Sequence, residues 1–477
     1  MVSKIAYGNP LSHRPMQLKD TLLVSLRRLS SGGVNASIFR AVMLVGGFTV
    51  LVKVAATIKE LLVANSFGRS DAVDAFLIAF LIPQTIINLT TTSFSASLVP
   101  VFAKVRAERG QLSAQSVLMR TLVASEAALV AFSALLGFCA PWIMRALGSN
   151  FSPIKRDLTC HLLYWLLPYI VINGFTIILG AVLNVYRRFL VTSITPLLTP
   201  LLTLLIIALY VNRWGIWTLV IGTLIGATTE ALITLLAFLG CGLRLTWGGN
   251  DLGHEVRSVL RQYLPLLGAG VLTGGIGLVD QSITASLPAG SVAAFAYGTK
   301  VVAVILTVIS GSLGTVLIPY FSEMAAQNDW LGCQKTIRIY SRLLLIVCVP
   351  LTIGMITFSH PLIRCLYQHG AFTANDSRVV SAVQIAYSIS IPFMSLGCIY
   401  VRFLSSVRRN EILMLVGVIN LVLDIVFDIV FGKMFGVAGI ALATSLFYVA
   451  SCALLAYFGR RELRRLSQDR MPLLSRG

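Results

Sequence analysis

The chain has 477 residues, of which 56% are hydrophobic and only 12% charged, and its mean hydropathy is +0.84. A soluble domain carries about 25% charged residues, so this composition excludes an ordinary soluble enzyme and predicts an all-α protein that crosses a membrane repeatedly. In a membrane protein the net charge of +19 is typical of basic cytoplasmic loops, and no nucleic-acid partner is expected.

The first 39 residues are polar and basic and form a predicted cytoplasmic segment, 1–39. No secretory apolar region with a cleavage site is evident, so we expect the N-terminus to be retained. The first long apolar segment, 40–67, carries Lys53, Lys59 and Glu60. A charge at bilayer depth costs about 2.5–3.5 kcal/mol, and Lys53 and Glu60 share one helix face. This helix is therefore expected to line a polar cavity.

Eleven further apolar segments follow, and a charged linker divides the twelve into two groups of six. The linker, 244–261, separates an N-terminal six-helix lobe, 40–243, from a C-terminal lobe, 262–458. A basic cytoplasmic tail, 459–477, follows the second lobe. The other predicted spans are 74–99, 117–139, 161–184, 190–211, 217–240, 263–287, 292–318, 340–358, 380–403, 412–431 and 437–457.

Lys and Arg are distributed unevenly over the loops. With the N-terminus in the cytoplasm, 27 of the 38 lie in cytoplasmic tails and loops or the adjoining helix turns. This bias predicts that both termini are cytoplasmic.

Short motifs recur at an offset of about 220 residues. An even number of spans per unit makes such halves parallel repeats, and two six-helix lobes around a central cavity is a transporter architecture. The recurring pairs are Ala75-Phe76 with Ala294-Phe295, Leu98-Val99-Pro100-Val101-Phe102 with Leu317-Ile318-Pro319-Tyr320-Phe321, Pro141-Trp142-Ile143-Met144-Arg145 with Pro361-Leu362-Ile363-Arg364, and Arg187-Arg188 with Arg408-Arg409.

Three lysines fall within predicted spans, and they are the candidate substrate contacts. Lys53, Lys59 and Lys300 would suit an anionic group such as a pyrophosphate, through charge-assisted hydrogen bonds. Snorkelling to the headgroups is the alternative for Lys59. Glu60 is predicted to orient or neutralise these lysines, and Asp74 either gates the outer side or interacts with its own helix dipole.

A polar stripe runs along the eleventh predicted helix, where Asn420, Asp424 and Asp428 follow one another at intervals of four. Carboxylates on a membrane helix can bind a coupling cation or carry protons, or they can hydrogen-bond to neighbouring helices. Asp424 and Asp428, with Asp280 on the seventh helix, are therefore candidates for ion coupling.

Catalytic and metal-binding patterns are absent from the sequence. The eight cysteines form no CxxC pair, the five histidines are scattered, and no P-loop, nucleophile elbow or nicotinamide fingerprint occurs. We expect a transporter without enzyme activity, cofactor or structural metal. Its driving force would be a monovalent cation, a proton gradient or the membrane potential.

An ordered set of motifs resembles the MurJ/MviN family over about residues 40–455. The resemblance implies the multidrug/oligosaccharidyl-lipid/polysaccharide exporter fold in a bacterial inner membrane. It also implies alternating access that moves a polyprenyl-diphosphate-linked saccharide precursor to the outer leaflet. The motifs are Val52-Lys53, Lys59-Glu60, Phe67-Gly68, Asp74-Ala75-Phe76, Ile82-Pro83, Leu98-Val99-Pro100, Gly180-Ala181-Val182-Leu183-Asn184, Gly290-Ser291-Val292, Leu317-Ile318-Pro319 and Gly370-Ala371-Phe372-Thr373.

The sequence departs from the family pattern at its basic positions, with Lys53 and Lys59 where the family has arginines and Gly298-Thr299-Lys300 where it has Ala-Asp-Arg. Ile87-Asn88 replaces a further arginine region, Thr91-Thr92 replaces an acidic element, and two expected C-terminal helices do not follow the twelfth. These departures favour an exopolysaccharide repeat unit as cargo, with lipid II a close second. A polymerase or glycosyltransferases of the same pathway are the expected protein partners, beside membrane lipids.

Two other functional classes remain open. A cation-coupled multidrug antiporter would use the same scaffold, but three buried lysines would repel cationic drugs. A membrane-embedded glycosyltransferase or ligase would need a sizeable outer loop or domain with convergent acids, and the predicted outer loops are short.

Overall fold

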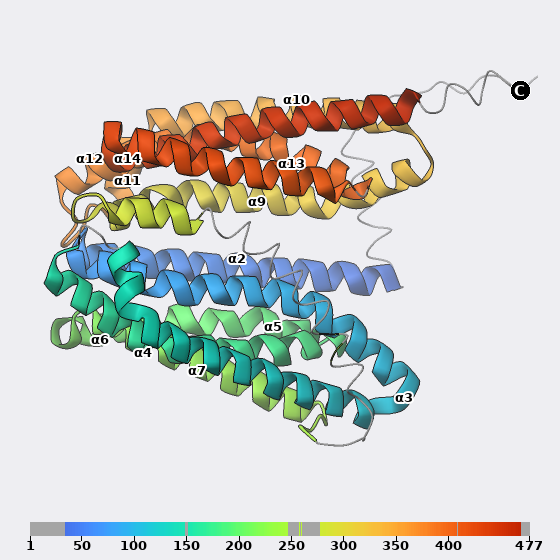
Figure 1. The fold of residues 1–477 in the computed structure, drawn as a ribbon, viewed down its shortest axis with the longest axis horizontal. Helices are drawn as coiled ribbons and strands as arrows, with labels where there is room; N and C mark the ends of the chain where they lie inside the picture. The colour runs from blue at the N-terminus through green and yellow to red at the C-terminus, as the bar shows by residue number, and fades with distance from the viewer. Residues whose placement is uncertain are drawn as a thin grey trace, which may run out of the picture.

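The computed structural model describes residues 34–147, 151–246, 257, 259, 277–407 and 409–468, and all regular elements in this part are helices. They form two lobes that lie side by side (Figure 1). The N-terminal lobe contains α2 (Val34–Phe67), α3 (Asp71–Leu147), α4 (Pro153–Val185), α5 (Phe189–Ile194), η1 (Thr195–Leu197), α6 (Leu198–Trp214) and α7 (Trp217–Gly240). The C-terminal lobe contains helix 277–285, α9 (Ser291–Ala326), α10 (Trp330–Thr357), α11 (Ser359–Tyr367), α12 (Ala374–Ser388), α13 (Ser390–Ser406) and α14 (Asn410–Gln468).

Two elements, α3 and α14, each contain two helices. The helices meet at Gly110 (φ 84°) and Gly436 (φ 60°), where the chain reverses direction (Figure 1). Within the described residues, nine helical segments are long and apolar enough to cross a membrane. Helices suit this environment because each satisfies its own backbone hydrogen bonds. The predicted all-α fold with about twelve spans in two lobes is confirmed.

Some helices extend beyond the predicted apolar segments. The second span, predicted to end at 99, continues in α3 to Gly110, and α14 continues to Gln468, so the predicted tail 459–477 begins as helix. Most of the predicted segment 1–39 and much of the linker 244–261 lie outside the described residues.

The internal repeat has a structural counterpart in the two cores. Leu98 and Phe102 are fully buried in the N-terminal lobe, and Leu317 and Phe321 are buried in the C-terminal lobe. Each phenylalanine contacts another ring, Phe102 with Tyr186 and Phe321 with Phe403. The recurring motif therefore supplies the same core positions in both lobes.

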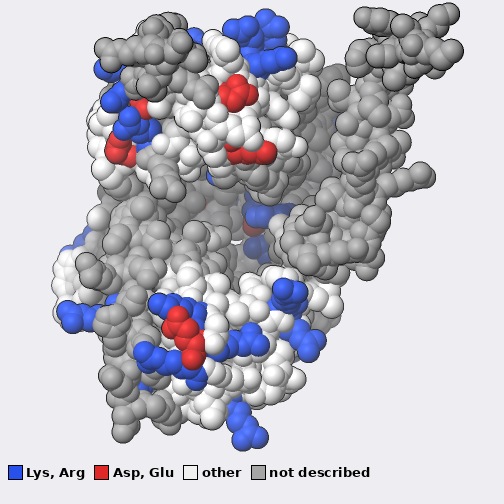
Figure 2. Space-filling model, turned by 90° about the vertical axis from the view of Figure 1, so that its right-hand side faces the viewer, with Lys and Arg blue, Asp and Glu red and all other residues white. Residues whose placement is uncertain are grey.

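The lobes contact each other at one end of the molecule and diverge toward the other. α3 packs against α9, and α2 packs against α11, near the end where α2 finishes. Figure 2 shows the opposite end, where a hollow lies between the lobes and holds basic and acidic side chains at its depth.

Candidate functional site

An ion-pair cluster joins the two lobes deep between them. The Glu60 carboxylate on α2 lies 3.3 Å from the Lys59 ammonium and 3.4 Å from the Lys300 ammonium on α9. The three side chains are 23%, 17% and 36% exposed for Lys59, Glu60 and Lys300. Two of the predicted lysines and the predicted orienting acid are thus brought together, although Lys300 is 240 residues from Glu60 in the chain.

The ion-pair cluster keeps a net positive charge and spare hydrogen-bond donors. Glu60 neutralises only one of the two lysines, and each ammonium has three N–H donors. Both contacts with Glu60 are longer than a tight charge-assisted hydrogen bond of about 2.7–2.9 Å. An anionic ligand can therefore be bound without first breaking a strong internal pair.

Lys53 lies outside this cluster. Its side chain is exposed on α2, about 10 Å along the helix axis from Glu60. It remains on the face that Glu60 shares, nearer the end where α2 begins.

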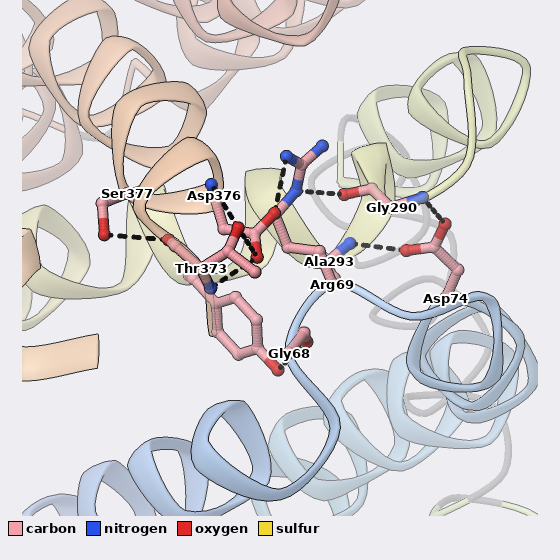
Figure 3. Close-up of polar contacts among 9 residues, drawn as sticks. Gly68, Arg69, Asp74, Gly290, Ala293, Thr373, Asp376 and Ser377 are labelled. Atoms are coloured by element: carbon pink, nitrogen blue, oxygen red, sulfur yellow. Dashed lines mark hydrogen bonds and ion pairs between the residues drawn. The ribbon is translucent and has the colours of Figure 1, made fainter. Parts of the chain in front are cut away.

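Asp74 lies where the lobes meet and interacts with both of them. Its carboxylate is 1% exposed and accepts hydrogen bonds from the backbone N–H of Gly290 (2.7 Å) and of Ala293 (2.8 Å), at the start of α9 (Figure 3). It also pairs with the Lys155 ammonium at 2.9 Å. A carboxylate at a helix N-terminus accepts from backbone N–H groups that have no partner within the helix, and it interacts favourably with the positive end of the helix dipole. The helix concerned is that of the other lobe.

Arg69 forms a second link between the lobes. Its Nε donates to the Gly290 carbonyl at 3.0 Å, and its Nη1 lies 3.2 Å from the Asp376 carboxylate (Figure 3). Nearby, the Ala371 N–H donates to the Asn65 carbonyl at 2.8 Å. We call the segments 65–74, 290–293 and 370–376, which make these contacts, the closed end.

Glycines allow the backbones to approach closely at the closed end. A Cβ on Gly290 (φ 78°) would lie 2.6 Å from the Arg69 carbonyl oxygen, and one on Gly68 (φ 58°) would lie 2.6 Å from the Ala371 carbonyl oxygen. Both positions also have left-handed backbone, which side chains disfavour. The Gly68 and Gly290 of the sequence motifs are therefore required by the interlobe contact itself.

A cluster of three acids lies inside the C-terminal lobe. One carboxylate oxygen from each of Asp280, Asp424 and Asp428 lies within 4.8 Å of the others, and all three side chains are buried. Five of their six oxygens have no hydrogen-bond partner. Carboxylates this close cannot all stay ionised without a cation or protons between them. This acid cluster brings together the three predicted ion-coupling residues, while Asn420 turns instead to Ser451 (2.9 Å).

The sequence does not indicate the roles of Arg69 and Asp376 in the closed end, or of Lys155, which contacts it through Asp74. The only local signal was Thr373 with Asp376 three residues later, a capping box that the structure confirms at the start of α12.

Comparisons with known proteins match this architecture. The family model described as lipid II flippase MurJ matches residues 63–473. The lipid II flippase MurJ of Burkholderia cenocepacia is 24% identical over 387 residues, which cover 77% of this chain and 72% of that protein.

Two solved structures share the fold. A lipid II flippase MurJ in an inward closed conformation superposes with a TM-score of 0.77 at 22% identity, covering 91% of both chains. An inward-facing multidrug resistance MATE family transporter superposes with a TM-score of 0.75 at 13% identity, covering 87% of this chain and 95% of that one. Because the family model covers most of its length, the chain belongs to the MurJ family of flippases, multi-pass proteins of the bacterial inner membrane that transport and do not catalyse a reaction.

Proposed function

We propose that this protein moves a polyprenyl-diphosphate-linked saccharide precursor across the membrane by alternating access. The observation that carries the proposal is the Lys59–Glu60–Lys300 cluster, which spans both lobes and retains a net positive charge. A diphosphate that displaces Glu60 from either ammonium gains charge-assisted hydrogen bonds from both lobes at once. Lys53, exposed toward the beginning of α2, is a further contact on the approach to the cluster.

Lipid II is the cargo that we propose. The matched family model and the relative from Burkholderia cenocepacia are both described as lipid II flippases. The sequence favoured an exopolysaccharide repeat unit because lysines replace family arginines, but neither the comparisons nor the geometry supports that preference. A lysine still supplies the charge that a phosphate needs, with looser geometry than arginine.

We assign this structure to the state in which the cargo enters. The closed end seals one side, whereas the hollow of Figure 2 opens at the side where α2 begins. The distribution of Lys and Arg predicts that this open side is cytoplasmic. Opening the closed end while closing the other side would then release the cargo outward.

The acid cluster is the proposed coupling site. Its unpartnered carboxylate oxygens suit a monovalent cation or protons, and the three acids lie on two separate segments of the C-terminal lobe. A cation bound between the three carboxylates would hold helix 277–285 and α14 together. It would thereby favour one conformation of the C-terminal lobe over another. Transport should therefore depend on sodium or on pH, and Asp424→Asn should remove most of that dependence. If transport by Asp424→Asn responds to sodium and to pH as wild-type transport does, the proposal is contradicted.

Complementation tests the cargo. Cells depleted of their essential lipid II flippase should be rescued by this chain, and the Lys300→Gln variant should fail to rescue at equal expression. A multidrug antiporter should leave the depleted cells unrescued and lower their sensitivity to cationic drugs. Failure of rescue, with accumulation of a different glycolipid when the gene is deleted, would identify another lipid-linked cargo.

A further inference from the structure

Arg402 is a charged residue in a membrane helix that the proposed transport does not use. It lies on α13, which ends four residues later at Ser406. Its Nε is buried and has no hydrogen-bond partner, and no acid of the described residues forms an ion pair with its guanidinium. The side chain is half-buried, and a buried donor such as this Nε is costly unless an acceptor bonds to it.

This arginine forms part of the wall of a cavity of about 260 Å³ between α9, α13 and α14. Most of the lining is apolar, from residues such as Leu306, Met394, Val401 and Leu455. We call this cavity the Arg402 pocket. Its lining extends along α13 from Phe393 to Arg402, about 13 Å, so the space is elongated along the helix axis.

The Arg402 pocket is separate from the sites described above. Leu306 lies about 120° around α9 from Lys300, so the pocket uses another face of that helix than the ion-pair cluster. Ser451 on the pocket wall bonds to Asn420, and neither Asp424 nor Asp428 lines the pocket.

We propose that the Arg402 pocket binds an anionic phospholipid, with its phosphate at Arg402 and an acyl chain along the apolar wall. Arginine presents a planar set of five donors that matches phosphate oxygens. The position of Arg402, about 6 Å before the end of α13, corresponds to the headgroup depth at that end of the bundle. An inorganic phosphate would leave the apolar wall facing water.

Exposed basic residues at the same end strengthen the charge complementarity. α14 continues as helix beyond the membrane span, and Arg460, Arg461, Arg464 and Arg465 are all exposed there. The extension is fixed by Glu462, which pairs with the Arg409 guanidinium at 2.8 Å. Such a cluster next to a membrane helix attracts anionic lipids.

Thiol protection tests the proposal on the purified, delipidated full chain in neutral detergent. Cys398 and Cys452 line the pocket, whereas Cys365 is exposed elsewhere and serves as an internal control. Dioleoyl phosphatidylglycerol should slow maleimide labelling of the two pocket cysteines about fivefold or more, and phosphatidylcholine should not. Peptide mass spectrometry gives the labelling rate at each cysteine.

The variant Arg402→Gln should lower the affinity for phosphatidylglycerol about tenfold, the effect of one charge-assisted hydrogen bond. Arg338→Gln removes an equal charge from the exposed surface of α10 and should behave as wild type. Phosphorus analysis of the purified proteins should show less retained anionic lipid in Arg402→Gln only. Equal retention by both variants, equal protection by phosphatidylcholine, or displacement by a polyprenyl diphosphate would overturn the assignment. None of these measurements involves transport, so they stand apart from the test of cargo.

Discussion

The closed end and the ion-pair cluster both join the two lobes, but they do so with different strength. At the closed end, backbone groups take part in four of the six contacts described above, and Asp74 has its three partners within 2.9 Å. In the ion-pair cluster, Glu60 forms two ion pairs with described residues, both longer than 3.2 Å, and both lysine partners are partly exposed. The closed end is therefore suited to hold one conformation, and the cluster is suited to exchange its partners for a ligand.

This difference predicts which residues control conformation and which control cargo. Substitutions at the closed end should change the population of the closed state, because the proposed alternating access requires these contacts to break when that end opens. Substitutions in the cluster should change cargo binding and leave closure intact. A cysteine pair, Asn65→Cys with Ala371→Cys in a background without the native cysteines, reports closure, since these backbones already meet at 2.8 Å.

Asp74→Ala should have the largest effect. It leaves Lys155, which is 6% exposed, without its buried partner and leaves two N–H groups of α9 unsatisfied. Only the two bonds from Gly290 and Ala293 cross between the lobes, and hydrogen bonds to a charged acceptor contribute about 1.5–3 kcal/mol each, enough together to lower the closed population more than 100-fold. Crosslinking between the two cysteines should be nearly lost.

The matched control is Asp71→Ala, because Asp71 contacts the same ammonium at 2.6 Å but is 57% exposed. Solvent screening should reduce its effect to less than about 1 kcal/mol. Equal crosslinking losses in the two variants would show that Lys155, rather than the capping of α9, determines closure.

Gly290→Ala should have the next largest effect. The new Cβ would lie 2.6 Å from the Arg69 carbonyl and would occupy left-handed backbone at φ 78°. Strain and overpacking together cost about 2–4 kcal/mol. Gly110→Ala also places a side chain at positive φ (84°), at ψ 178° where non-glycine residues are at least as disfavoured, but with no atom within 4 Å, so it tests positive-φ strain without close approach. If both variants lose crosslinking equally, close approach does not matter at the closed end.

The fold was largely predictable, since twenty-residue apolar segments, basic loops and a repeat are local features of the sequence. The lysines of the site were predictable because a charge within a membrane helix is costly and therefore usually marks a functional site. This rule also identified Asp280, Asp424 and Asp428, and the structure places Asp280 beside the other two, although it precedes them in the chain by more than 140 residues.

The contacts of the closed end could not be predicted from the sequence, because they depend on how the two lobes pack against each other. Lys155 and Arg69 look like ordinary loop charges, and only the fold places them beside Asp74 and Gly290. The sequence also does not reveal that the Arg402 Nε is buried without a hydrogen-bond partner, since a position near a helix end predicts exposure to headgroups. Packing between distant segments decides such roles, and local pattern carries little information about it.

Lys300→Gln should have a smaller effect, limited to cargo. The substitution removes one cross-lobe ammonium and should weaken binding of a polyprenyl diphosphate about tenfold, the effect of a charge-assisted hydrogen bond. Closure should stay near the wild-type level, because the pair with Glu60 is long and partly exposed. Binding is measured by titration of the detergent-solubilised protein, and crosslinking is measured in parallel. A large loss of closure with unchanged binding would reverse the roles assigned to the two regions.

Arg69→Gln should have the smallest effect of the four. The variant loses the bond to the Gly290 carbonyl and the ion pair with Asp376, both at partly buried positions. Asp376 nevertheless keeps its bonds from the Thr373 N–H and hydroxyl, each at 2.8 Å, so no carboxylate is left without partners. We expect a cost of about 1 kcal/mol and a fivefold decrease in the closed population, measured by the same crosslink. The closed population of Arg69→Lys should lie between those of the wild type and Arg69→Gln. An ammonium can pair with Asp376 but lacks a second donor group for the Gly290 carbonyl. A loss as large as that of Asp74→Ala would mean that Arg69, and not the buried carboxylate at the start of α9, holds the lobes together.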